Sequence, residues 1–288
     1  MVMPGAVLVF VPAAVSWYLQ GWQARLPGTQ EYPAKIAAMV APGFDSDMAA
    51  QWRAGTCFMD RGQGAESFMA ECIDDRDADK LVFLWGDSHA AALYPGLLAL
   101  AENSDFGIAQ FTANSCPPAL AWQGNINSRC RQINEAILTR IEQIRPAILV
   151  LQAAWYMGEY AAIHLAGTLQ RLKTLGIPNI VVIGPPPLWA DNVPYLIFVH
   201  YRETREILAP VGDEKLVWSV IEKTGPAIHA VTEQEGATYV SLTDTLCYVR
   251  GIRPYFDDVL NVTSLDGGDL TPQASVFAMR QLAGSLAP

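Results

Sequence analysis

The strongest constraint on the fold is an alternation of short apolar runs with amphipathic segments, which repeats five times after Lys80. Each run is too short for a typical helix and is rich in aliphatic or aromatic residues, as in strands buried on both faces. The segments between the runs carry apolar residues at helical spacing. This alternation predicts a parallel sheet with helices on both faces. The expected strands lie within residues 80–87, 106–114, 147–155, 179–187 and 237–246.

The first run ends in Gly86-Asp87-Ser88-His89, directly before a helix-like segment. In parallel sheets, ligand sites form outside the carboxyl ends of the strands. An Asp or Ser at this junction is a common N-cap, and Gly86 permits a tight turn. The same position would hold Ser88 beside the N–H groups at the helix N-terminus, which can stabilise an oxyanion. The motif is therefore either a helix cap or a serine nucleophile.

Polar or aromatic residues also follow other strands of the expected sheet. Asn114 follows the second strand, and Trp155 ends the third. A loop with Asp266 and Asp269 comes before the final helix, for which Thr271 is the expected N-cap. The carboxyl ends of parallel strands meet at one edge, so these side chains are candidates for a site shared with the serine motif.

Charge and motif content limit the classes of partner. The chain has 288 residues and a formal net charge of −10, with no basic stripe. Nucleic-acid binding needs clustered Lys and Arg, so we expect no nucleic-acid partner. No expected strand is followed by a phosphate-binding glycine motif, and no His/Cys cluster has zinc-ligand spacing. We therefore expect no cofactor and no metal.

The cysteines indicate the redox compartment. Two pairs, Cys57/Cys72 and Cys116/Cys130, each bracket a polar, loop-like stretch of the sequence. Two local disulfides would suit this layout and would place the domain in an oxidising compartment, with Cys247 left over. The alternative is a set of five unrelated buried thiols.

The N-terminus suggests a membrane connection. Residues 1–24 carry no charged side chain, and residues 6–22 are largely apolar and just long enough to span a bilayer. Aromatic residues near the end of this segment are typical of a membrane interface. We interpret residues 1–24 as a membrane helix or the remnant of one, the alternative being an apolar helix packed on the domain. Residues 25–79 are then a linker and loop-rich entry region, and residues 80–288 form the α/β domain.

Taken together, the Gly86–His89 motif and the Asp266–Asp269 block resemble the SGNH (GDSL) hydrolase superfamily. The sequence is most similar to the SGNH domain at the C-terminus of acyltransferase-3 membrane proteins, which O-acetylate cell-surface polysaccharides. The stretches "NSCPP", "VVIGPPP" and "SLTDTLC" agree with that subfamily. The resemblance implies a three-layer α/β sandwich with a five-stranded parallel sheet, arranged as in flavodoxin.

The resemblance also implies a function. It predicts a serine esterase or O-acyltransferase without a cofactor, facing the periplasm or the cell exterior at the cell membrane. A cell-surface glycan or an acyl donor would be the substrate, and an acyltransferase-3 membrane domain a further partner. Ser88 would form the acyl-enzyme and Asp266 would belong to the relay. The oxyanion and pocket residues would include Gly86, Asp87, His89, Asn114 and Trp155.

The block before the final helix departs from the family pattern at its last position. The family has D-x-x-H there, whereas this chain reads Asp266-Gly267-Gly268-Asp269. Asp269 therefore stands where the catalytic histidine is expected. Its reference pKa is about 3.9, against about 6.5 for histidine, which makes an ordinary aspartate a weaker base near neutral pH. Burial beside Asp266 would raise one of the two pKa values.

Few histidines are available to replace the missing base. His89 adjoins Ser88, but neighbouring side chains on such a turn normally point elsewhere. His164 and His229 fall within expected helices and are interpreted as helix-face residues, and His200 lies in a segment that could reach over the site. The alternative to an active enzyme is a degenerate, catalytically impaired SGNH domain that binds a glycan or a partner protein.

Overall fold

A computed structural model provides the structure of this chain. It describes residues 44–76, 78–122, 129–155, 159–204, 216–217, 220–248, 251–252 and 261–286. All of them belong to the compact unit Met39–Pro288. The predicted membrane segment, residues 1–24, lies outside the described residues. Within those residues, no helix has both the length and the apolar character needed to cross a membrane.

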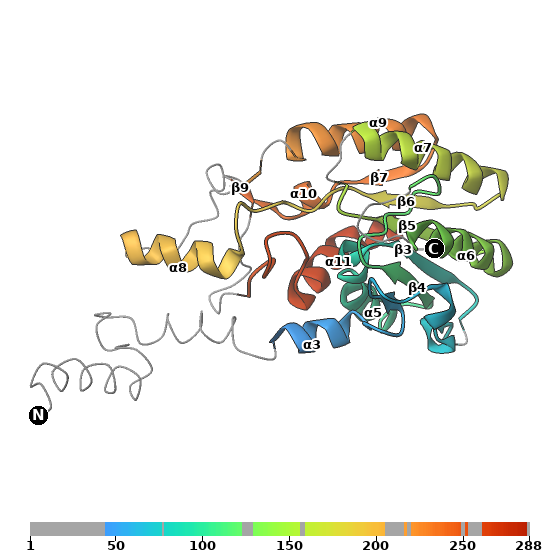
Figure 1. Cartoon of the computed structure of the whole chain (residues 1–288), viewed down its shortest axis with the longest axis horizontal. Coiled ribbons are helices and arrows are strands. Elements are labelled where there is room, and N and C mark those ends of the chain that lie inside the picture. The colour runs from blue at the N-terminus through green and yellow to red at the C-terminus, as the bar shows by residue number, and fades with distance from the viewer. Residues whose placement is uncertain are drawn as a thin grey trace, which may run out of the picture. The chain divides into compact units, whose positions relative to one another are not determined.

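The predicted parallel sheet is present (Figure 1). Its five main strands are all parallel and lie side by side in the order β4-β3-β5-β6-β7, the flavodoxin-like arrangement. β3 is therefore an interior strand, with β4 and β5 as its neighbours. The strands are β3 (Leu81–Gly86), β4 (Gly107–Ala113), β5 (Ile148–Gln152), β6 (Ile180–Ile183) and β7 (Thr238–Val240).

Two further strands, too short to show any sequence periodicity, also pair with β4. β1 (Phe58–Met59) runs parallel to β4, and β2 (Ile73–Asp74) runs antiparallel to it. The described part of the sheet thus has seven strands. The loop-rich entry region contributes both of the additional strands.

Helices cover both faces of the sheet, as the alternation predicted (Figure 1). α6 (Cys130–Ile144), α7 (Glu159–Thr174) and α9 (Gly225–Gln234) bury their apolar stripes against one face. α5 (Tyr94–Ala101) and α11 (Pro272–Leu286) pack against each other on the opposite face. Strand side chains alternate between these two cores, with Phe83 and Trp85 facing α6 and α7.

Shorter elements complete the described chain. The single helix predicted before β7 is divided into two elements at Gly225-Pro226. A π-helical turn ends just before Gly225, and α9 begins at Gly225. A proline is tolerated in the first turn of a helix because its missing N–H would have no partner there. The remaining elements are α3 (Phe44–Gln51), η2 (Ala65–Ser67), η3 (Ala70–Cys72), α4 (Ser88–Ala91), α8 (Val193–Thr204), η4 (Val220–Thr224), α10 (Leu242–Thr245), β8 (Cys247–Tyr248) and β9 (Gly251–Ile252).

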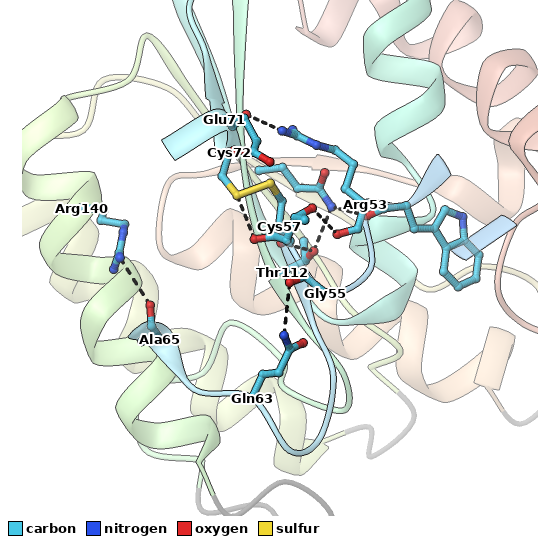
Figure 2. The surroundings of a disulfide bond; sticks show 12 residues. Arg53, Gly55, Cys57, Gln63, Ala65, Glu71, Cys72, Thr112 and Arg140 are labelled. Atoms are coloured by element: carbon cyan, nitrogen blue, oxygen red, sulfur yellow. Dashed lines mark hydrogen bonds between the residues drawn. A yellow bond between two sulfur atoms is a disulfide. The ribbon is translucent and has the colours of Figure 1, made fainter. Parts of the chain in front are cut away.

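Both predicted disulfides are present. Cys57–Cys72 joins residues whose Cα atoms are 5.3 Å apart, and Cys116–Cys130 joins Cα atoms 5.2 Å apart. Figure 2 shows the first disulfide beside Thr112 of β4, whose hydroxyl donates a hydrogen bond to the Cys57 carbonyl (3.1 Å). Cys57 immediately precedes β1 and Cys72 immediately precedes β2. This disulfide therefore ties together the two short strands that pair with β4.

Candidate active site

The turn after β3 is braced by the side chain of Asp87. Its Oδ1 accepts the His89 N–H (3.0 Å), which makes Asp87 the N-cap of α4. Its Oδ2 accepts the Ala154 N–H (3.0 Å), just beyond the end of β5. Asp87 is buried, and burial raises its pKa against the opposing effects of His89 and of these backbone donors. The helix-cap and nucleophile interpretations are therefore compatible, because the cap residue and Ser88 are different residues.

Gly86 is needed for close packing between strands. A Cβ atom at this position would lie 1.7 Å from the Gln152 carbonyl oxygen and 2.7 Å from the Ala90 Cβ. The sequence suggested a tight turn as the reason for glycine, but Gly86 does not have a positive φ. The absence of a side chain lets β3, β5 and the start of α4 approach one another.

Asp269 lies against the turn after β3, beside the Ser88 and His89 side chains. The Ser88 hydroxyl lies near enough to the Asp269 carboxylate to favour its ionised form. His89 Nδ1 lies 3.1 Å from Asp269 Oδ1, which is within ion-pair distance. The two atoms are not aligned for a hydrogen bond. The His89 and Asp269 side chains are only 7% and 13% exposed. The structure therefore places a largely buried carboxylate beside the Ser88 and His89 side chains.

Burial makes this carboxylate a stronger base than the sequence alone indicates. Desolvation raises the pKa of Asp269 to about 6, assisted by the carboxylates of Asp266 and Asp87 and opposed by His89 and the Ser88 hydroxyl. The reference pKa of histidine is about 6.5, so most of the difference from an ordinary aspartate disappears. A base with a pKa near the working pH combines adequate basicity with a useful ionised fraction.

Asp266 is exposed and organises the loop that carries Asp269. Its Oδ1 accepts hydrogen bonds from the Ser264 hydroxyl (3.0 Å), the Gly268 N–H (3.0 Å) and the Asp269 N–H (2.9 Å). The carboxylate thus holds the backbone of Asp269 directly. Its membership of a catalytic relay stays a prediction, while its effect on the loop is evident from these contacts.

The loop that carries Asp269 leads into α11, which packs on α5. Thr271 Oγ1 accepts the Ala274 N–H (3.2 Å), which confirms Thr271 as a cap of α11. The Gly96 N–H of α5 donates to Ser275 Oγ (2.9 Å), and a Cβ on Gly96 would lie 2.4 Å from the Ser275 carbonyl oxygen. Close packing of α5 on α11 therefore links the segment that carries Ser88 to the one that carries Asp269.

A pocket of about 340 Å³ opens beside Ser88. Asp87, Ser88, His89 and Trp155 are among the residues that line it. Ser115 also lines the pocket, whereas its predicted neighbour Asn114 is not among the lining residues. The Asn114 Oδ1 instead accepts hydrogen bonds from the Ser115 hydroxyl (2.8 Å) and from the Arg61 Nε–H (3.4 Å).

Two residues on the pocket have an unfavourable backbone conformation. Ser115 (φ 54°) and Trp155 (φ 50°) are non-glycine residues in the left-handed region, one after β4 and one after β5. Such a conformation costs about 1–2 kcal/mol and is concentrated at functional sites. The Trp155 Nε1–H donates to the Ile183 carbonyl (2.9 Å), which helps hold the indole in place.

His164 also lines the pocket, although its sequence suggested an ordinary helix-face residue. It follows Ala161, another lining residue, by one turn of α7, so both project from the same side of that helix. Pro117, Ala119 and Trp122 complete this side of the pocket and were missed by sequence reasoning. Neither His200 of α8 nor His229 of α9 lines it. Among the described residues, no cluster of three His, Cys, Asp or Glu residues could hold a metal ion.

The sequence comparison decides the family. Residues 56–279 match the family model described as "SGNH domain (fused to AT3 domains)". The chain belongs to this family. Family membership supports an esterase-type enzyme that hydrolyses or transfers acyl groups. A search of curated proteins found no significant match.

One solved structure shows the same fold, and two others are similar at lower TM-scores. The periplasmic domain of a lipopolysaccharide acetyltransferase from Salmonella ser. Paratyphi A is 21% identical, with a TM-score of 0.77 over 88% of this chain and 100% of that chain. A carbohydrate acetylesterase family member from Sinorhizobium meliloti is 12% identical, with a TM-score of 0.40 over 72% and 97% of the two chains. A lipase/acylhydrolase from Enterococcus faecalis is 10% identical, with a TM-score of 0.43 over 71% and 96%.

Proposed function

We propose that this SGNH domain is a serine O-acyltransferase or esterase in which Ser88 is the nucleophile and Asp269 is the general base. The observation that carries the proposal is the largely buried carboxylate of Asp269, which lies against the Ser88 turn 3.1 Å from His89 Nδ1. Desolvation raises its pKa to about 6, and the Ser88 hydroxyl favours its ionised form. A serine is a weak nucleophile until an adjacent base accepts its proton. At neutral pH Asp269 is largely ionised, so it is able to do so.

The reaction has two balanced steps. Ser88 Oγ attacks the acyl carbonyl carbon, its proton passes to Asp269, and the bond to the alcohol leaving group breaks as Asp269 returns that proton to the leaving oxygen. A hydroxyl of the acceptor, or water, then attacks the acyl-enzyme. Its proton passes to Asp269 and on to Ser88 Oγ as the ester bond to the enzyme breaks. His89, whose Nδ1 lies 3.1 Å from Asp269 Oδ1, orients the carboxylate.

The N-cap of α4, Asp87, decides which backbone N–H groups are available to an oxyanion. The His89 N–H is already donated to the Asp87 carboxylate, so it is not available to a ligand. The Ser88 N–H, at the first position of α4, is therefore the donor we assign to the oxyanion, with Ser115 on the facing loop as the second group. Removal of one such donor typically lowers kcat by about 100- to 1,000-fold.

We assign the acyl-bearing molecule to the cell-surface glycans and the domain to the periplasm or cell exterior. Fusion of this family to acyltransferase-3 domains and the two disulfides support that location. The relative from Salmonella is itself a periplasmic domain of a lipopolysaccharide acetyltransferase. An acyltransferase-3 membrane domain would be the partner that supplies the acyl group.

Hydrolysis of p-nitrophenyl acetate by purified variants tests the assignment. We expect Ser88→Ala and Asp269→Asn each to lower kcat by at least about 1,000-fold, because the two residues act as one unit. His229→Ala, a change on the exposed side of α9, serves as the matched control. Unchanged turnover in Ser88→Ala would remove this serine from the mechanism.

The second candidate, a binding domain with little turnover, is favoured by the aspartate at position 269. Asp269→His distinguishes the two candidates. If Asp269 is a working base, the histidine variant and the natural protein have activities of the same order. Activity that appears only in Asp269→His would show that the natural domain is impaired.

A further inference from the structure

Five of the residues that line the pocket form what we call the aromatic wall: Pro117, Ala119, Trp122, Ala161 and His164. The Trp122 and His164 rings meet edge to face, with their centroids 5.9 Å apart and an interplanar angle of 89°. Both side chains are only half-buried, so they retain surface that a ligand can contact. Neither residue takes part in the reaction steps proposed for Ser88.

The aromatic wall is held rigidly by the elements behind it. Asn134 of α6 is fully buried, and its Nδ2 donates to the carbonyls of Pro117 (2.8 Å) and Ala119 (3.2 Å). Thr168 of α7 accepts the Leu120 N–H at its hydroxyl (3.1 Å), which ties this loop to the helix that carries His164. The Cys116–Cys130 disulfide closes the same loop. Such fixed surroundings are what a preorganised binding site requires.

The size of the pocket exceeds the needs of a small acyl group. An acetyl group occupies on the order of two water volumes, about 60 Å³ in all. The pocket holds about 340 Å³, which leaves room for a group of about ring size beside the ester. Asp87 is the only carboxylate among the lining residues and lies at the Ser88 end. The aromatic wall is therefore suited to a neutral ligand with both apolar and hydrogen-bonding surfaces.

We propose that the aromatic wall is the subsite for a neutral pyranose ring of the ester substrate. Trp122 stacks on the C–H face of the sugar, while His164 fixes the indole edge to face. A few polar groups on an apolar, aromatic surface are the usual composition of a small-ligand site. The proposal rests on the acyl-transfer function proposed above and names the residues that select its substrate.

The test compares two esters on the full chain. A peracetylated methyl glucoside carries an acetyl ester on each sugar hydroxyl, whereas vinyl acetate has a leaving group too small to fill the pocket. We expect Trp122→Ala to lower the ratio of kcat/KM for the glucoside to kcat/KM for vinyl acetate by about tenfold, chiefly through KM. Trp122→Phe should restore most of the ratio, and His164→Ala should lower it by about threefold. His229→Ala, outside the pocket, is the control.

The outcomes separate this proposal from the one on which it rests. Absence of hydrolysis of both esters by the natural protein would count against the acyl-transfer function itself. Hydrolysis of both esters with an unchanged ratio in Trp122→Ala would overturn the sugar subsite alone. Selective loss of activity by Trp122→Ala on vinyl hexanoate, with the glucoside unaffected, would also overturn it, because the wall would then hold the acyl chain.

Discussion

Replacing Asp269 by Asn should make the folded domain more stable at neutral pH while removing its base. The pKa of Asp269 is about 6 in the fold, against 3.8 for an ordinary aspartate. The folded-state pKa is above the unfolded-state pKa, so ionisation of this group costs stability. The cost is absent below about pH 4, grows as the pH rises and is complete above about pH 6. At about 1.36 kcal/mol per pH unit, it amounts to about 3 kcal/mol.

Asn has the shape of the protonated carboxyl but cannot ionise, so it avoids this cost. Urea unfolding at pH 7.5 should show Asp269→Asn to be up to about 3 kcal/mol more stable than the natural protein. At pH 4 the two should differ little. Asp105→Asn is the matched control, because Asp105 is an exposed aspartate away from the pocket. An Asp269→Asn protein that is less stable at pH 7.5, or equally stabilised at both pH values, would refute the reasoning.

Three other predictions follow from the same geometry. The kcat/KM for p-nitrophenyl acetate should fall about tenfold from pH 7 to pH 5, because Asp269 must be ionised. His89→Gln should move the midpoint to higher pH, since His89 lowers the pKa of Asp269. Gly86→Ala should cost about 3 kcal/mol of unfolding free energy or more because of its backbone overlap, whereas Gly167→Ala, in α7 with open space around it, should gain about 0.5 to 1 kcal/mol. Replacing the two cysteines in Figure 2 by serine should lower the free energy of unfolding by about 3 kcal/mol relative to the oxidised natural protein.

The sequence was sufficient for features that depend on local or periodic patterns. The five main strands were predictable because strands buried on both faces need uninterrupted apolar runs, and the helices between them because each buries one stripe. The cap at Thr271 and the two disulfides were predictable because each joins residues close in the sequence. The motif at Ser88 was recognisable because the turn after the first strand has few permissible residue types.

Only the tertiary structure decided how the site works, because burial and contacts between distant segments leave no local signal. β1 and β2 are each two residues long and each pairs with β4, so their sequences show no strand periodicity. His164 meets Trp122 across a pocket formed by separate segments, which its place in a helix did not reveal. The same applies to Asp269: its residue type indicated a weak base, and desolvation against the Ser88 turn raises its pKa to about 6. The sequence determined that an aspartate stands at position 269, the proposed base, and the folded environment determined its pKa.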